Sequence, residues 1–252
     1  MKNYHTHTTR CMHAIGSEEE YILAAISAGY TELGFSDHTP WHYESGYHAT
    51  MRMDESQLED YVHTLSVLRD KYKDKISIKI GLEVEYFEDK MEWLKEQLET
   101  YKLDYIILGN HFDGSDETGI YYGYPVSLEE LKRYVSQVIK AMDTGLFSYV
   151  AHPDVVFYDE KNQEHIDELE KICIHAAEID MPLEFNLLGY KAMRHYPSQT
   201  FIDLCKKHHN RIIIGTDAHE PDALKDSKTY NRAYTYLKES GLEITEDIKM
   251  LR

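Results

Sequence analysis

The 252-residue sequence has little cysteine, an excess of acidic over basic residues, and no long apolar run. Its three cysteines, Cys11, Cys173 and Cys205, lie far apart and form no Cys-x-x-Cys pair. This pattern argues against a disulfide framework and indicates a reducing compartment. No segment is apolar for long enough to span a bilayer, and the N-terminus lacks a signal-peptide pattern. We therefore expect a cytoplasmic protein that does not associate with membranes.

Basic side chains are scarce. The sequence has 27 Lys and Arg against 45 Asp and Glu, a net charge of −18. Such a surface repels phosphate backbones and anionic lipids, which argues against a nucleic-acid partner or a membrane partner. An acidic protein that acts on an anion needs a local source of positive charge, and bound divalent cations would supply it. The sequence does not indicate an oligomeric state.

Strand-like and helical segments alternate along the whole chain. Seven strands are predicted, at the opening residues and at 31–36, 76–83, 104–109, 147–151, 182–186 and 211–215. Helices are predicted at 17–29, 54–72, 89–101, 127–144, 164–180, 197–209 and 228–240. This α/β pattern predicts a parallel sheet in one domain over residues 1–252. Either a TIM-like barrel that is one unit short or an open doubly wound sheet fits, and both bind ligands where the strands end.

Potential metal ligands stand where these strands end. His5 and His7 are two residues apart, so an extended strand turns both imidazoles to one face. Other imidazoles and carboxylates follow later strands, so that the full set is His5, His7, Asp37, His38, Glu83, His111, His152, Asp217 and His219, with His13 in the loop after His7. A single histidine here is most simply a polar residue ending a strand. Because six of the seven strands end this way and a barrel gathers strand ends into a ring, the set favours the barrel.

The remaining histidines and Cys11 have different surroundings. Cys11 lies between His7 and His13 and could be a ligand, although small buried thiols are common without one. The histidines on predicted helices are interpreted as packed or solvated residues: His63, His165, His175, His208 and His209. His42, His48 and His195 lie in loops that could line the mouth of a pocket.

The number of candidate ligands predicts two or three divalent ions, of zinc, manganese or iron. Such a cluster lowers the pKa of bound water and holds the attacking and leaving oxygens of an in-line displacement at phosphorus. Phosphoester hydrolysis is the chemistry that this arrangement favours. Amide hydrolysis and deamination remain alternatives, but they commonly use only one or two ions.

The ordered motifs of the chain resemble those of the PHP family, named for polymerase and histidinol phosphatase. The motifs that carry the resemblance are His5-Thr6-His7, His13, Ser36-Asp37-His38, Gly81-Leu82-Glu83, Gly109-Asn110-His111, Ala151-His152-Pro153-Asp154 and Thr216-Asp217-Ala218-His219. The resemblance implies a distorted seven-stranded (β/α)7 TIM-like barrel with metals at the C-terminal ends of its strands. Chain length, the turn at 37–40 and the segments 184–186 and 195–198 are most similar to those of the stand-alone histidinol-phosphate phosphatases.

The resemblance also implies roles for the candidate ligands. The first metal would be held by His5, His7, Glu83 and Asp217, the second by Glu83, His111 and His152, and the third by His13, His38 and His219. Asp37 would orient an imidazole or act as an extra ligand. Glu83 would thereby hold both the first and the second metal, and Asp217 the first. A hydroxide that bridges these two metals is expected to attack phosphorus.

The chain departs from the family pattern at the substrate-binding side of the site. No basic residue follows the motif at 151–154, so Arg194 is predicted to contact the phosphate, with a plain surface arginine as the alternative. The proton for the leaving alcohol is expected from His195, Asp113 or a metal-bound water. The cationic organic part of the substrate is expected to meet acidic and aromatic side chains, namely Trp41, Tyr43, Tyr86, Asp113 and Tyr190.

These observations predict a metal-dependent phosphatase that hydrolyses L-histidinol phosphate to L-histidinol and phosphate in histidine biosynthesis. The alternatives are a PHP phosphoesterase acting on nucleotides or other small phosphate esters, and a 3′–5′ exonuclease. A metal-binding domain without turnover is a third alternative, which the complete ligand set disfavours.

Overall fold

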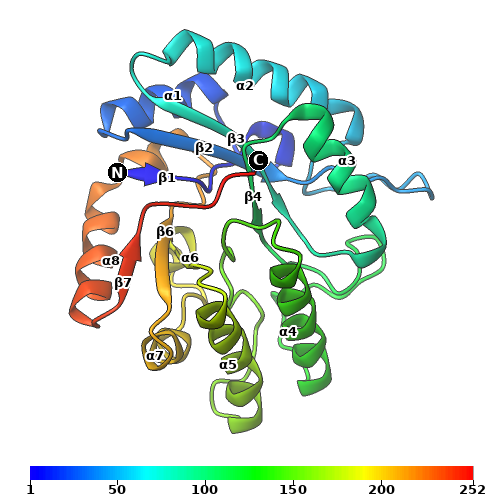
Figure 1. Cartoon of the computed structure of the whole chain (residues 1–252), viewed down its shortest axis with the longest axis vertical. Helices are drawn as coiled ribbons and strands as arrows, with labels where there is room; N and C mark the ends of the chain where they lie inside the picture. Colours follow the sequence, from blue (N-terminus) through cyan, green and yellow to red (C-terminus); the bar gives the residue numbers. More distant parts are fainter. Residues whose placement is uncertain (252) are drawn as a thin grey trace.

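The computed structural model describes residues 1–251 and contains two parallel sheets (Figure 1). The first has the strand order β1-β2-β3-β4 and the second has the order β5-β6-β7. The strands are β1 (Lys2–Asn3), β2 (Glu32–His38), β3 (Ser77–Val84), β4 (Tyr105–Leu108), β5 (Leu183–Asn186), β6 (Arg211–Gly215) and β7 (Glu243–Thr245). All neighbouring strands are parallel, as the alternation of strands and helices predicts.

Helices cover the outside of both sheets (Figure 1). They are α1 (Glu18–Ser27), α2 (Leu58–Tyr72), α3 (Met91–Tyr101), α4 (Leu128–Asp143), α5 (Gln163–Glu178), α6 (Leu187–Ala192), α7 (Gln199–Lys207) and α8 (Ser227–Glu239). Four short 3-10 helices join them, at η1 (Thr9–Cys11), η2 (Glu55–Gln57), η3 (Glu88–Lys90) and η4 (Pro221–Lys225). The capping box expected at Ser17 is present, because Ser17 and Glu20 satisfy each other's backbone N–H groups. Within residues 1–251, no helix combines the length and the apolar character needed to cross a bilayer.

The two sheets meet through single-residue bridges. Thr6, after β1, pairs with Ala218 after β6, and Val150 pairs with both Leu108 and Leu183. A small buried cluster lies between the sheets and takes side chains from both of them: Tyr4, Tyr105, Ile107, Tyr149, Ala151 and Ile213. The first four strands follow one another in sequence order, without the reversal that defines a doubly wound sheet. The open-sheet alternative is therefore wrong for this part of the chain.

The structure corrects the predicted elements at three places. Residues 147–151 form no strand, because only Val150 makes a bridge. The seventh strand is instead β7, an edge strand too short and polar to give a clear signal. Helix α6 was not predicted either. It begins directly after β5, where the Asn186 side chain accepts a hydrogen bond from the Gly189 N–H and caps it.

Candidate metal centre and its cavity

The first two histidines lie on an extended segment held between two other strand ends. The His7 N–H donates to the Ala218 carbonyl and the Ala218 N–H donates to the His5 carbonyl, at 2.9 and 3.1 Å. On the other side, the Ser36 N–H donates to the Thr6 carbonyl. Because alternate residues of an extended chain face the same side, His5 and His7 point together into the space between the sheets.

Glu83 lies at the centre of the cluster. It stands near the end of β3 in register with His38 of β2, which is the reason these two side chains are neighbours. The site needs glycine at position 109, since a Cβ atom there would lie 2.0 Å from Glu83 Oε1. Two other candidate ligands, His152 and Asp217, have positive φ angles of 29° and 51°. Such backbone strain in non-glycine residues commonly collects at functional sites.

Four ligand atoms are arranged as an ion would require. His5 Nε2 lies 3.6 Å from Glu83 Oε2 and 3.4 Å from Asp217 Oδ1. His7 Nε2 lies 3.5 and 3.2 Å from the same two oxygens. A tetrahedron whose corners lie about 2.1 Å from a central zinc ion has edges of about 3.4 Å. These four atoms therefore fit a single divalent cation.

Two further groups adjoin this one. Glu83 Oε1, the other oxygen of the same carboxylate, lies 2.8 Å from His152 Nε2 and 3.6 Å from His111 Nε2. On the opposite side, the imidazole of His219 stacks on those of His7 and His13, with ring centroids 4.2 and 4.7 Å apart.

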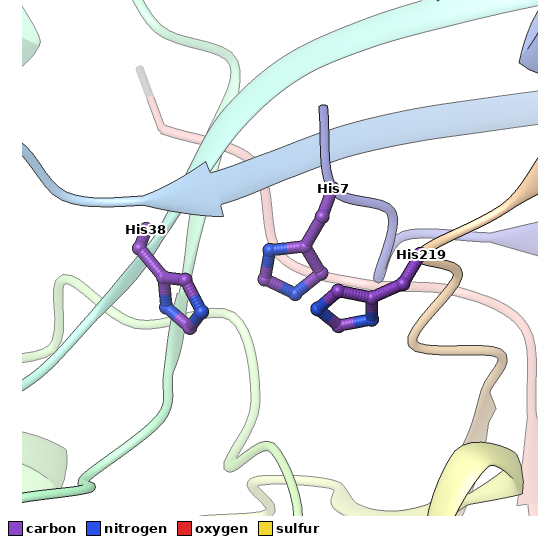
Figure 2. A group of neighbouring side chains, drawn as sticks. All are labelled: His7, His38 and His219. Carbon is purple, nitrogen blue, oxygen red and sulfur yellow. The ribbon is translucent and has the colours of Figure 1, made fainter. Parts of the chain in front are cut away.

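Figure 2 shows His7, His38 and His219 converging from three different segments of the chain. Each of these three residues offers a ligand atom within 4.8 Å of the others. The structure thus brings together the nine candidate ligands at the strand ends and His13 from the loop after His7.

The cluster carries buried polar atoms that find no hydrogen-bond partner within residues 1–251. They include His5 Nε2, His38 Nδ1, Glu83 Oε2, His111 Nδ1, His152 Nδ1 and Asp217 Oδ1. Unpaired buried groups of this kind are costly unless something compensates them. Divalent cations would do so, and the nitrogen and oxygen donors present suit zinc, manganese or iron.

Burial and neighbouring charges shift the pKa values of Glu83, His38 and His219 in the direction that metal binding needs. Burial by itself would raise the pKa of Glu83, but the charges of His38, His111 and His5 lower it well below its ordinary value. Burial lowers the pKa of His38 to about 4. Burial also lowers the pKa of His219 to about 3, and His7 contributes further lowering. Glu83 is therefore anionic, and these two imidazoles are neutral and can offer a lone pair.

Three carboxylates support the histidines from outside. Glu184 accepts a hydrogen bond from His5 Nδ1 at 2.8 Å and another from the His152 N–H at 2.9 Å. Asp37 Oδ1 lies 3.5 Å from His7 Nδ1, as expected for a residue that orients an imidazole. Glu85 Oε1 lies 3.5 Å from His111 Nδ1.

The sequence pattern predicts no role for Glu184 or Glu85. Strand alternation could have indicated Glu85 as a member of the site, because side chains 83 and 85 point to the same face. For Glu184 the signal is Gly215, where a Cβ atom would lie 1.7 Å from the Glu184 carboxylate.

The cluster opens into a cavity of about 500 Å³. Its lining includes candidate ligands, apolar side chains and two further polar residues, Arg194 and Tyr196. Among the described residues 1–251, Arg194 is the one Lys or Arg in this lining. Its Nη1 donates to the Tyr196 hydroxyl at 2.6 Å. The cavity thus combines candidate metal ligands with one guanidinium, which suits an anion bound among them.

Five residues expected to contact the organic part of a substrate do not line this cavity within residues 1–251. Trp41 is buried and packs on Phe87 and Trp93 with its indole N–H donating to Glu85. The Tyr43 hydroxyl donates to Asp116. Tyr86 and Asp113 line a separate cavity, where Asp113 pairs with Arg133 at 2.6 Å, and Tyr190 lies under the guanidinium of Arg232.

These five residues lie outside the cavity, so they take no part in the proposed substrate site. The side chains that line the cavity in their place are Met51, Phe112, Tyr121, Val155, Leu188 and Tyr196.

His195 is also used elsewhere. Its Nε2 donates to the Val155 carbonyl at 2.7 Å, and its ring stacks on Phe157 with an interplanar angle of 7°. Burial lowers the pKa of His195. The expected role as proton donor therefore finds no support in this geometry.

Cys11 is fully buried beside the metal cluster. Its sulfur lies within 4.8 Å of ligand atoms of His13 and His219 in one grouping, and of His7 and Asp37 in another. The expected alternative of a thiol ligand thus remains open. The other two cysteines face each other between α5 and α7, with sulfurs 3.9 Å apart.

Comparison with known proteins gives a consistent result. A Deinococcus radiodurans protein named "Probable histidinol-phosphatase" is 28% identical over 228 residues, which cover 86% of this chain and 85% of the relative. The "Histidinol-phosphatase" of Bacillus subtilis is 26% identical over 249 residues, covering 86% of this chain and 92% of the relative.

A similar fold is found in the crystal structure of the Lactococcus lactis histidinol phosphate phosphatase complexed with Zn, L-histidinol and phosphate. The TM-score is 0.74 at 21% identity, and the superposition covers 100% of this chain and 98% of that one. The family model of the PHP domain matches residues 3–187. With most of its length inside this match, the chain belongs to the PHP domain family.

Proposed function

We propose that this protein is a metal-dependent phosphatase that hydrolyses L-histidinol phosphate to L-histidinol and inorganic phosphate. The observation that carries the proposal is the cavity whose lining holds both unpaired imidazole and carboxylate atoms and Arg194. Metal ligands and a guanidinium in one cavity suit a small phosphate ester. The histidinol-phosphatase names of the relatives that match most of the chain support the choice of substrate.

The proposed ligand sets are those that the resemblance to the PHP family implies. His5, His7, Glu83 and Asp217 would hold one ion, and Glu83 with His111 and His152 a second. His13, His38 and His219 would hold a third. When bound, such ions supply Lewis-acid charge to a phosphoryl group and lower the pKa of water. The zinc in the Lactococcus lactis structure supports a divalent ion of this type.

The chain's own residues position the reactants. Glu184 and Asp37 fix His5 and His7 through the nitrogens that face away from the centre. Arg194 offers its guanidinium to the phosphate oxygens, while its bond to Tyr196 holds it toward the cavity. The apolar walls, which include Phe112, Val155 and Leu188, limit the water around the bound ester and strengthen these charge interactions.

We also infer that the two sheets form one distorted seven-stranded barrel within a single domain of residues 1–252. The bridges at Thr6 and Val150 support this, because each joins a strand end of one sheet to the other. So does the shared cluster that includes Tyr4, Tyr105 and Ile213. The closure matters for function because it brings ligands from both sheets to one centre.

The test compares substrates for the metal-loaded protein. Phosphate release is measured from L-histidinol phosphate, AMP and a single-stranded oligonucleotide, with and without prior removal of metal by a chelator. We expect histidinol phosphate to be cleaved with the highest kcat/KM and all activity to vanish after chelation, returning with zinc or manganese. Faster cleavage of AMP or of the oligonucleotide would replace the proposed substrate, and activity that survives chelation would contradict the metal-dependent mechanism.

Replacing Arg194 tests the phosphate contact. We expect Arg194→Ala to lower kcat/KM for histidinol phosphate by about 10- to 100-fold, mainly through KM, because a charge-assisted hydrogen bond to a phosphate contributes about 1.5–3 kcal/mol. Steady-state kinetics and inhibition by inorganic phosphate measure the effect. Arg69→Ala is the control, since Arg69 pairs with Asp104 outside this cavity. An unchanged affinity for phosphate in Arg194→Ala would remove the residue from the site.

A further inference from the structure

The reaction needs a proton for the alcohol that leaves, and this inference rests on the function proposed above. The two side chains expected from the sequence to provide that proton are committed to other partners. His195 donates its Nε2 proton to a backbone carbonyl, and Asp113 is paired with Arg133 at another cavity. The remaining expected source is a metal-bound water, and the side chains that line the cavity offer a further donor.

Tyr196 lines this cavity and is held beside the metal cluster. Its ring meets that of His152 edge-on, with centroids 5.9 Å apart. The side chain is buried, with a relative exposure of 5%. The phenol is therefore in contact with the reaction space and sheltered from bulk water.

The direction of the hydrogen bond to Tyr196 decides where its proton points. A guanidinium can only donate, so in the 2.6 Å contact from Arg194 Nη1 the phenol oxygen must be the acceptor. Within residues 1–251, the Tyr196 O–H has no acceptor of its own. The proton is thus free for a group inside the cavity, and the neighbouring guanidinium would stabilise negative charge left on the oxygen.

We propose that Tyr196 is the catalytic proton donor to the leaving alcohol. As the bond between phosphorus and the ester oxygen breaks, its electron pair passes to that oxygen, which takes the phenol proton and leaves as the alcohol. The water oxygen forms the new bond to phosphorus. The phenolate that remains accepts the Arg194 hydrogen bond and regains a proton from the attacking water or from solvent, so that no other reactant is needed.

The test uses the leaving group as its readout. An alkyl alcohol leaves poorly without a proton, whereas p-nitrophenolate is a stable anion and needs none. We expect Tyr196→Phe to reduce kcat for L-histidinol phosphate by about 100-fold, within the range for loss of a general acid. For p-nitrophenyl phosphate we expect a reduction of less than about threefold. Metal content and the circular dichroism spectrum should match those of the wild type.

A second variant removes the other phenol in the same lining, Tyr121, whose hydroxyl makes no hydrogen bond with Arg194. Equal losses of activity on both esters in Tyr196→Phe would indicate a structural role and overturn the proposal, as would no loss on either. A loss confined to the alkyl ester in Tyr121→Phe, and absent in Tyr196→Phe, would reassign the donor. Failure of the wild type to cleave histidinol phosphate would instead overturn the proposed substrate, and the comparison of alkyl with aryl esters then uses the alkyl phosphate that it does cleave.

Discussion

Replacing Glu83 by glutamine should reduce kcat/KM for histidinol phosphate by more than about 100-fold and lower the amount of bound metal. The side chain keeps its size, so the close approach to Gly109 is preserved and the effect is chemical. Glu83 places one oxygen near His5, His7 and Asp217 and the other near His152. A carboxylate can offer one negatively charged oxygen to each of two cations, whereas the neutral amide of glutamine cannot. Since loss of a mere supporting partner costs about 10- to 100-fold in affinity or activity, loss of a shared ligand should exceed that.

Steady-state kinetics in added manganese, with elemental analysis of the purified protein, measures both effects. Glu129→Gln is a matched control, because Glu129 is 73% exposed on α4 and pairs with Lys132 on the surface. If Glu83→Gln kept activity within about threefold of the wild type and the full metal content, a bridging role for Glu83 would be untenable.

Replacing Arg52 by methionine should destabilise the protein strongly, although Arg52 is not itself a candidate metal ligand. Arg52 is almost fully buried, at 1% exposure, and donates to Glu85 at 2.7 and 2.8 Å and to Asp116 at 2.8 Å. Methionine leaves both carboxylates buried without their cation. Removing one partner of a buried ion pair typically costs about 3–5 kcal/mol. Urea unfolding at neutral pH measures this free energy.

The loss of unfolding free energy in Arg52→Met should become smaller as the pH falls. Burial by itself raises the pKa of Glu85, but Arg52 lowers it far below its ordinary value in the folded wild type. The pair therefore stabilises the wild type above the unfolded pKa of about 4.3, and this contribution is lost only as the pH falls below it. In Arg52→Met burial still raises the pKa of Glu85, and His111 is the lowering group that remains. Glu85 can then take up a proton in the variant. The difference in unfolding free energy between wild type and variant should therefore be smaller at pH 5 than at pH 7.5.

The surface pair of Arg69 with Asp104 provides the comparison for this measurement. Arg69 is 39% exposed, so Arg69→Met should cost less than about 1 kcal/mol at any of these pH values. Similar unfolding free energies for Arg52→Met and Arg69→Met would show that the buried triad does not hold the loop of residues 41–53 against β3.

Local patterns in the sequence predict most of the alternating strands and helices, and they indicate which residues could bind metal. Local signals suffice for these features. Alternation along a strand turns His5 and His7 to one face, and a capping box starts α1 at Ser17. The clustering of imidazoles and carboxylates after strands needs only the rule that parallel strands end at one edge of a sheet.

Which side chains face the cavity and which groups support the ligands depends on the tertiary structure alone. Trp41, Tyr43 and Tyr190 make their contacts away from the cavity, because nothing in their local sequence fixes the direction of an aromatic ring. Glu184 reaches His5 across 179 positions, and such a contact depends on sheet closure rather than on local pattern. Hydrogen bonds between residues far apart in the chain form only in the complete fold, and they position the candidate ligands and Arg194.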